Sequence, residues 1–226
     1  MKRSEINHEI RDAQAFLDKH GFALPPFASW TPDHWKTVGS EADEIRSRAL
    51  GWDVTDFGSG RFGEIGLTVF TIRNGRLDDD GNRKIYAEKI LIVREDQVTP
   101  FHFHFSKTED IINRGGGNLV VVLCNSDEKE ELADTPVTVS CDGVTRTVPA
   151  GGKVVLGTGE SITLVPGVYH EFKGEAGSGT VLVGEVSSVN DDAVDNRFLN
   201  ELPRFPEIEE DETPLRLLCT EYPRVG

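Results

Sequence analysis

Hydrophobic and polar positions follow two different periods along the chain, and the period changes near residue 51. Between Glu5 and His20 the apolar residues recur at intervals of three and four, which predicts an amphipathic helix. Ser4 is placed to cap the start of this helix, and Gly21 is placed to close its end. The following segment FALPPFASWTPDHW has neither period, so we expect it to cross the domain as ordered, non-regular chain.

From about Gly51 onward, apolar and polar residues alternate in short runs that are separated by turn residues. The runs are IGLTVFTIRNG, KIYAEKILIV, PVTVSCDGVTRTV, KVVLGTGESITLVPG and GTVLVGEVSSV. In the third run Asp142 and Gly143 suit a two-residue hairpin turn, because both tolerate positive φ. Many short strands with regular turns predict a mainly β sandwich or barrel. We expect one domain over residues 1–226, with a helical and aromatic arm (1–50), a barrel (about 51–190) and a C-terminal extension (191–226).

Composition and charge argue against several classes of binding partner. A net charge of −15 over 226 residues argues against binding to nucleic acid or to an anionic membrane. The three cysteines are far apart and have no CxxC spacing, so neither a disulfide framework nor a zinc finger is indicated. No apolar run is long enough for a signal peptide or a membrane span, and we expect a cytoplasmic protein.

The segment TPFHFHFSKTED contains two of the six histidines of the chain. On a strand His102 and His104 project from the same face, while the phenylalanines between and beside them point into packing on the other. Glu109 follows closely enough for a turn to bring its carboxylate alongside, and His170 opens a later strand in VPGVYHEF. Imidazoles with one carboxylate suit Mn²⁺, Fe²⁺, Co²⁺ or Zn²⁺. The alternative for any single histidine is a buried side chain with local hydrogen bonds.

This arrangement resembles the two metal-binding boxes of the cupin superfamily, whose fold is a double-stranded β-helix or jelly-roll barrel. His102, His104, Glu109 and His170 fall at the positions of the metal ligands in these boxes. The residue type departs from the pattern at two turn positions, and the usual proline is displaced by one, to Pro166. Asp96 stands where a glycine is usual, and Gly174 replaces the usual asparagine, so the ligand set that the resemblance implies is unaffected.

Beyond these boxes the chain resembles bacterial D-lyxose isomerases over nearly its whole length. The resemblance is carried by FALPPFASWTPDHW, by YAEKILIVREDQVTPFHFHFSKTEDIINRGGGNLVV and by GEVSSVNDDAVDNRF. It implies a metal-dependent aldose–ketose isomerase that acts on the free sugars D-lyxose and D-xylulose, with D-mannose and D-fructose as further substrates. A sugar would chelate the ion through O1 and O2, and Mn²⁺ is the ion that we expect. The resemblance also implies a homodimer.

Candidates for proton transfer and substrate binding follow from their positions. Glu185 lies among valines in a strand, where a carboxylate is costly unless it faces a polar pocket. Lys107 and Glu109 lie in the loop after the histidines, where the lysine can neutralise an enediolate. The remaining candidates are Asp195 for proton transfer, and Arg197, Asp192 and Lys89 for binding hydroxyl groups of the sugar. The alternatives are a solvent-facing strand residue for Glu185, a solvated Lys107 and a polar loop with a local salt bridge around Asp195.

Other functions fit parts of the same sequence. An Fe(II) dioxygenase would use the same ligands, and a non-catalytic sugar sensor would use the same barrel. The chain has neither a helix-turn-helix segment nor a basic patch through which a sensor would act on DNA. A phosphosugar isomerase would need several cations near the pocket, and the motif regions contain mainly acids. We therefore expect a free sugar.

Overall fold

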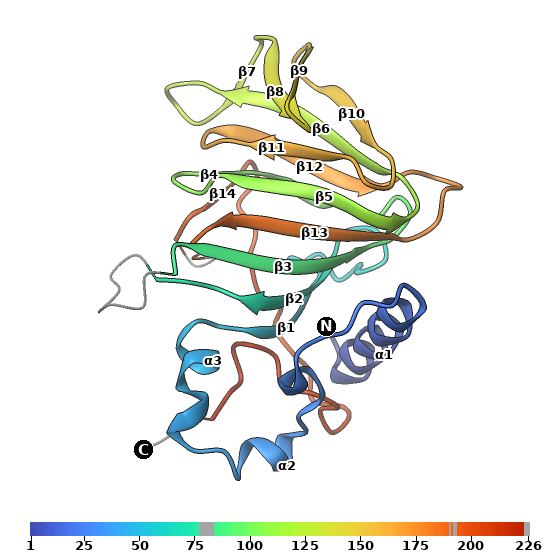
Figure 1. Cartoon of the computed structure of the whole chain (residues 1–226), viewed down its shortest axis with the longest axis vertical. Coiled ribbons are helices and arrows are strands. Elements are labelled where there is room, and N and C mark those ends of the chain that lie inside the picture. The colour runs from blue at the N-terminus through green and yellow to red at the C-terminus, as the bar shows by residue number, and fades with distance from the viewer. Residues whose placement is uncertain (77–83, 190, 192–193, 224–226) are drawn as a thin grey trace.

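The computed structural model describes residues 1–76, 84–189, 191 and 194–223. Among these residues the strands form two antiparallel sheets (Figure 1). The larger sheet has the order β1-β2-β3-β13-β5-β11-β8-β9, and the smaller has the order β10-β6-β12-β4-β14, with β7 beside β6. The bounds are β1 Gly51–Thr55, β2 Leu67–Arg73, β3 Tyr86–Val93, β4 Thr99–His104, β5 Glu109–Gly116, β6 Leu119–Ser126, β7 Leu132–Ala133, β8 Val137–Cys141, β9 Val144–Val148, β10 Gly152–Leu156, β11 Ser161–Leu164, β12 Val168–Gly174, β13 Val181–Ser188 and β14 Asn196–Phe198.

The two sheets enclose the main hydrophobic core, and strand alternation decides which side chains enter it. In β8, Val137, Val139 and Cys141 are buried in this core, while Thr138 between them is exposed. The Asp142–Gly143 turn joins β8 to β9 with φ values of 51° and 81°, as the sequence predicts. The predicted mainly β jelly-roll barrel is therefore confirmed.

A second hydrophobic cluster fixes the N-terminal helix to the outside of the larger sheet (Figure 1). Helix α1 (Arg3–Lys19) buries Ile6, Ile10, Ala13 and Leu17 against side chains of β1, β2 and β3. Each fully buried Ile or Leu stabilises the fold by about 1.5–3 kcal/mol. The helix thus forms because its apolar stripe finds a sheet to cover.

The start of α1 differs from the prediction. Lys2 is the N-cap, and its backbone N–H donates to the carboxylate of Glu5 at 2.7 Å. Ser4 lies inside the first turn, where its hydroxyl donates to Asp211 at 2.7 Å. The prediction for Ser4 was wrong, because its hydroxyl binds the carboxylate of Asp211, near the other end of the chain, and does not cap the helix. Gly21 follows the helix with φ +65°, as expected of a residue that closes a helix end.

The short helices of the arm carry aromatic side chains into the interior. They are η1 (Pro26–Ser29), α2 (Pro32–Trp35), η2 (Ser40–Ala42) and α3 (Asp43–Ser47). Trp35 and Trp52 are buried, and Trp35 stacks on Tyr222 with ring centroids 4.1 Å apart. Both tryptophans therefore pack in the interior of the protein. No helix in the described part of the chain is long and apolar enough to cross a membrane.

The C-terminal extension contributes both to the barrel and to the attachment of α1. Its strand β14 pairs with β4, so the barrel takes a strand from beyond the predicted limit near residue 190. Further on, Glu210 and Glu221 both contact the guanidinium of Arg3, whose side chain is completely buried. Arg3 donates to Glu210 through Nε at 2.9 Å and through a terminal nitrogen at 2.6 Å. One buried cation therefore connects the two ends of the chain.

Replacing Arg3 with methionine is expected to lower the unfolding free energy by about 2–3 kcal/mol. This is less than the loss for a fully buried pair, because Glu210 is half exposed and can be solvated by water. Thermal denaturation should show a melting temperature lower by about 5–10 °C. Arg11→Met is the control, since Arg11 lies in the same helix and meets Glu212 at 3.9 Å on the surface. An equal fall in melting temperature in both variants would contradict the stabilising role of the Arg3 ion pairs.

Candidate active site

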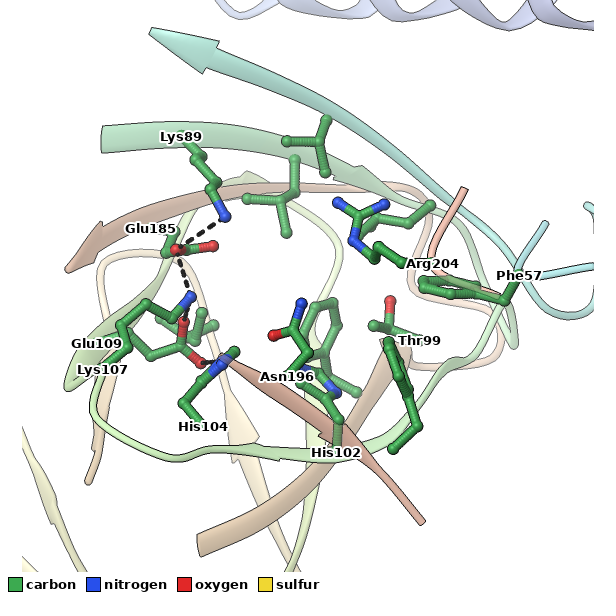
Figure 2. A pocket seen from close by; sticks show the side chains of 16 residues that line it. Phe57, Lys89, Thr99, His102, His104, Lys107, Glu109, Glu185, Asn196 and Arg204 are labelled. Carbon is green, nitrogen blue, oxygen red and sulfur yellow. Dashed lines mark hydrogen bonds and ion pairs between the residues drawn. The ribbon is translucent and has the colours of Figure 1, made fainter. Parts of the chain in front are cut away.

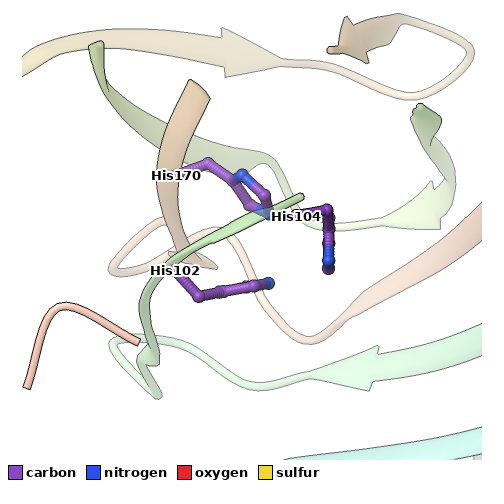
Figure 3. Close-up of side chains that lie close together, drawn as sticks. All are labelled: His102, His104 and His170. Atoms are coloured by element: carbon purple, nitrogen blue, oxygen red, sulfur yellow. The ribbon is translucent and has the colours of Figure 1, made fainter. Parts of the chain in front are cut away.

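Three histidines from neighbouring strands of the smaller sheet converge inside the barrel (Figure 3). His102 and His104 alternate on β4, and His170 on β12 is the direct cross-strand partner of His102. One ring nitrogen from each lies within 4.8 Å of the other two, and all three side chains are buried. Phe103 packs on the opposite face, as predicted. Phe105 was predicted to pack as well but is 50% exposed, because β4 ends at His104.

Backbone carbonyls fix the tautomers of two of these histidines. Nδ1 of His102 lies 2.8 Å from the carbonyl oxygen of Pro100, and Nδ1 of His170 lies 3.0 Å from that of Val168. Each Nδ1 therefore carries the proton and donates it, which leaves Nε2 with a free lone pair directed into the barrel. This is the usual arrangement of a metal-binding imidazole.

The carboxylate of Glu109, at the start of β5, faces the histidines. Its Oε1 lies 3.1 Å from Nε2 of His170 and 3.4 Å from Nε2 of His104. Within the described residues, neither of these buried Nε2 atoms has a well-directed hydrogen bond. Nε2 of His170, whose Nδ1 carries the proton, and the carboxylate oxygen are both acceptors, so their approach is favourable with a cation between them. The donor set therefore fits a divalent metal ion.

The charge states of these groups also suit a metal ion. Burial holds the pKa of His102 well below its usual range and lowers the pKa of His104, so both are neutral near pH 7. Burial alone would raise the pKa of the Glu109 carboxyl, but the Lys107 ammonium together with the neighbouring His104 and His170 outweighs it and holds that pKa well below its usual range. Neutral imidazoles with one carboxylate are the ligands that first-row divalent ions prefer.

Beside the histidines, two lysines and two glutamates form a buried chain of ion pairs (Figure 2). Nζ of Lys107 lies 2.7 Å from Oε2 of Glu109 and 2.9 Å from Oε1 of Glu185. Nζ of Lys89 lies 3.4 Å from that same oxygen of Glu185. Glu185 and Lys89 are cross-strand partners on β13 and β3, and both face the interior. Both lysines contact Oε1, so Oε2 of Glu185 takes no part in these ion pairs.

A pocket that is partly open to solvent lies between the sheets and joins these groups to a second polar end (Figure 2). That end contains Thr99 and Arg204 beside the ring of Phe57, while Asn196 lies nearer the histidines, as the cross-strand partner of His104. Arg204 meets Asp53 at 2.7 Å. Sequence reasoning missed these residues, because Phe57 and Arg204 lie in irregular segments without any periodic signal.

Two predicted residues do not line the pocket, and a third lies outside the described residues. Asp195 does not line the pocket, since its carboxylate accepts hydrogen bonds from Ser106 and from the backbone N–H of Lys107. It therefore holds the loop that carries Lys107 in place. Arg197 pairs with Glu130 at 2.9 Å and is not among the residues that line the pocket, so its contact with substrate stays a prediction. Asp192 lies outside the described residues.

Comparison with known proteins agrees with this arrangement. A family model described as D-lyxose isomerase matches residues 1–222. The D-lyxose/D-mannose isomerase of Escherichia coli O157:H7 is 52% identical over 223 residues, which cover 98% of each chain. The protein of the same name from Serratia proteamaculans is 52% identical over 225 residues, which cover 99% of each chain.

Solved structures show the same fold at low sequence identity. The L-ribose isomerase of Cellulomonas parahominis, solved with L-ribose, has a TM-score of 0.61 and 17% identity, with 92% of this chain and 98% of that one covered. The L-ribose isomerase of Geodermatophilus obscurus has a TM-score of 0.61 and 15% identity over the same shares. These structures support the fold, and the match to the family over nearly the whole chain assigns the family. The chain belongs to the D-lyxose isomerase family of aldose–ketose sugar isomerases.

Proposed function

We propose that the chain is a divalent-metal-dependent isomerase that interconverts D-lyxose and D-xylulose, and D-mannose and D-fructose as a second pair. The observation that carries the proposal is the position of Glu185 beside the cluster of His102, His104, His170 and Glu109. These four residues would hold the ion, with Mn²⁺ favoured over Co²⁺, Fe²⁺ or Zn²⁺. A bound ion would act as a Lewis acid that polarises the carbonyl group and stabilises negative charge on oxygen.

The residues of the chain supply the proton transfer. Glu185 removes the proton from one of C1 and C2 and returns it to the other through its free oxygen, Oε2. Lys107 lies between Glu185 and Glu109, where its positive charge stabilises the enediolate as it develops. Lys89 contacts the same oxygen of Glu185, Oε1, so two ammonium groups fix the orientation of the base. Glu109 is a poorer base than Glu185, because its oxygens face the histidines and Lys107.

A free sugar fits the charges of the pocket better than a phosphosugar does. The three cations that line it are Lys89, Lys107 and Arg204. Each contacts a carboxylate of this chain, namely Glu185, Glu109 or Asp53. A phosphate would have to compete with these carboxylates, whereas hydroxyl groups can hydrogen-bond to lysine, arginine and carboxylate alike. A homodimer and a cytoplasmic location stay predictions from the sequence.

The test asks whether the proton that moves between C1 and C2 exchanges with solvent, with deuterium as the label. Protein stripped with a chelator is reloaded with Mn²⁺ under nitrogen and incubated with D-lyxose in D₂O. We expect D-xylulose with deuterium bound to carbon, since a proton held by Glu185 exchanges with solvent. Product without deuterium would contradict proton transfer through Glu185 and favour a hydride shift. Turnover that requires oxygen would favour the dioxygenase alternative, and no turnover of any aldose would favour a sugar-binding protein.

A further inference from the structure

The ring of Phe57 closes the pocket at the end away from Glu185 (Figure 2). Phe57 lies two residues after the end of β1 and is 2% exposed. Its ring meets that of Phe198 edge to face, with centroids 5.7 Å apart, and lies 6.0 Å from the guanidinium carbon of Arg204. An aromatic ring thus forms one wall of the pocket beside a polar group that can bind hydroxyls.

The backbone at this position is unusual for a bulky residue. Phe57 has φ +51°, in the left-handed region that favours glycine, and Gly58 follows with φ +73°. Such a conformation persists only where the surroundings enforce it, and it is enriched at functional sites. Here the chain turns so that the ring points into the pocket.

Hydrogen bonds from neighbouring side chains enforce this turn. The hydroxyl oxygen of Thr55 accepts from the backbone N–H of Phe57 at 3.0 Å, and the hydroxyl donates to the carbonyl oxygen of Arg204 at 2.9 Å. The carboxylate of Asp56 accepts from the backbone N–H groups of Gly58 and Gly60, each at 3.0 Å. The hydroxyl group of Thr55 therefore links the turn that contains Phe57 to the segment that contains Arg204.

We infer that Phe57 limits the length of the sugar and so discriminates between five-carbon and six-carbon aldoses. The inference rests on the proposed function, in which C1 and C2 lie beside Glu185. The remaining carbons must then extend toward Phe57 and Arg204. D-Mannose matches D-lyxose at C2, C3 and C4 and is longer by one carbon with its hydroxyl, and the ring of Phe57 occupies space at the end that this carbon would reach.

The test compares the two sugars in each variant. For Phe57→Leu we expect the ratio of kcat/KM for D-mannose to that for D-lyxose to rise about tenfold, the usual effect of one carbon in an apolar pocket. For Phe57→Tyr we expect the ratio to fall, because the added hydroxyl shortens the pocket. The control is Phe70→Leu, a buried phenylalanine in the cluster under α1 that does not line the pocket, and its ratio should equal that of the wild type.

Each outcome separates this inference from the proposed function. Unchanged ratios in both Phe57 variants, with both sugars still converted, would overturn the inference and leave the isomerase assignment intact. An equal rise in Phe70→Leu would also overturn it, because general loosening of the fold would then be the cause. A wild-type protein that converts neither sugar would overturn the proposed function and this inference together. If Phe57→Leu does not fold, the fall expected for Phe57→Tyr decides the question.

Discussion

Replacing Glu185 with glutamine is expected to lower kcat for sugar isomerisation by about 10²–10⁴-fold, the usual contribution of a positioned acid–base group. Glutamine keeps the shape of the side chain and can still accept a hydrogen bond from Lys107, but it cannot take up a proton from carbon. Glu185 makes no direct contact with the three histidines in the structure, and so the affinity for Mn²⁺ should stay unchanged. Steady-state kinetics with D-lyxose and a calorimetric Mn²⁺ titration measure the two quantities separately.

The matched control for this variant is Glu88→Gln. Glu88 lies on β3 next to Lys89, but it faces outward and pairs with Arg73 at 3.2 Å. We expect its kcat to be within about twofold of the wild type, since surface substitutions are usually mild. If Glu185→Gln retained most of the wild-type kcat, the base would have to be another group, and Glu109 would be the next candidate.

His102, His104 and Glu185 could be found from the sequence because each depends on local alternation. Two residues spaced by two on a strand must share a face, whatever the rest of the chain does. A glutamate flanked by valines in a buried strand likewise predicts a polar pocket on its side. These inferences need only the strand to exist, and the hydrophobic pattern indicates that reliably.

The orientation of Arg197 could not be predicted from local alternation. The segment NDDAVDNRF is mainly polar and has no regular alternation, so it does not reveal which residues of the short strand β14 face inward. A shift of one residue exchanges the two faces. The structure directs Asn196 and Phe198 into the pocket and Arg197 outward. Arg204 lies in an irregular segment. The course of such a segment is set by contacts with distant residues, so the local pattern of hydrophobic and polar residues does not predict that Arg204 lines the pocket.

The two departures from the cupin pattern also have physical explanations that sequence alone does not supply. Asp96 stands at a usual glycine position and adopts φ +53°, a conformation that aspartate tolerates better than most residues. At Gly174 an added Cβ would lie 2.6 Å from the carbonyl oxygen of Arg94, so any larger residue would collide with backbone. The barrel thus keeps the turn geometry while the residue types change.

Removing one imidazole should abolish the metal site without unfolding the barrel. For His170→Ala we expect Mn²⁺ affinity to fall by at least about 100-fold, because loss of a ligand exceeds the 10–100-fold effect of losing an outer hydrogen bond. Isomerase activity at micromolar Mn²⁺ should fall to background, as it should for wild-type protein treated with a chelator. Readdition of Mn²⁺ should restore the chelated wild type only.

A second measurement of the same site does not depend on activity. Metal that binds the folded state alone stabilises it by about 2.7 kcal/mol at 100 times its dissociation constant. Wild-type protein should therefore melt at a higher temperature when Mn²⁺ is added, and His170→Ala should not. His34→Ala is the control, since His34 is exposed on α2 outside the pocket and should leave both responses intact. Full activity after exhaustive chelation, with no metal left in the protein, would exclude the proposed metal dependence and leave Glu185 and the two lysines as the whole catalytic apparatus.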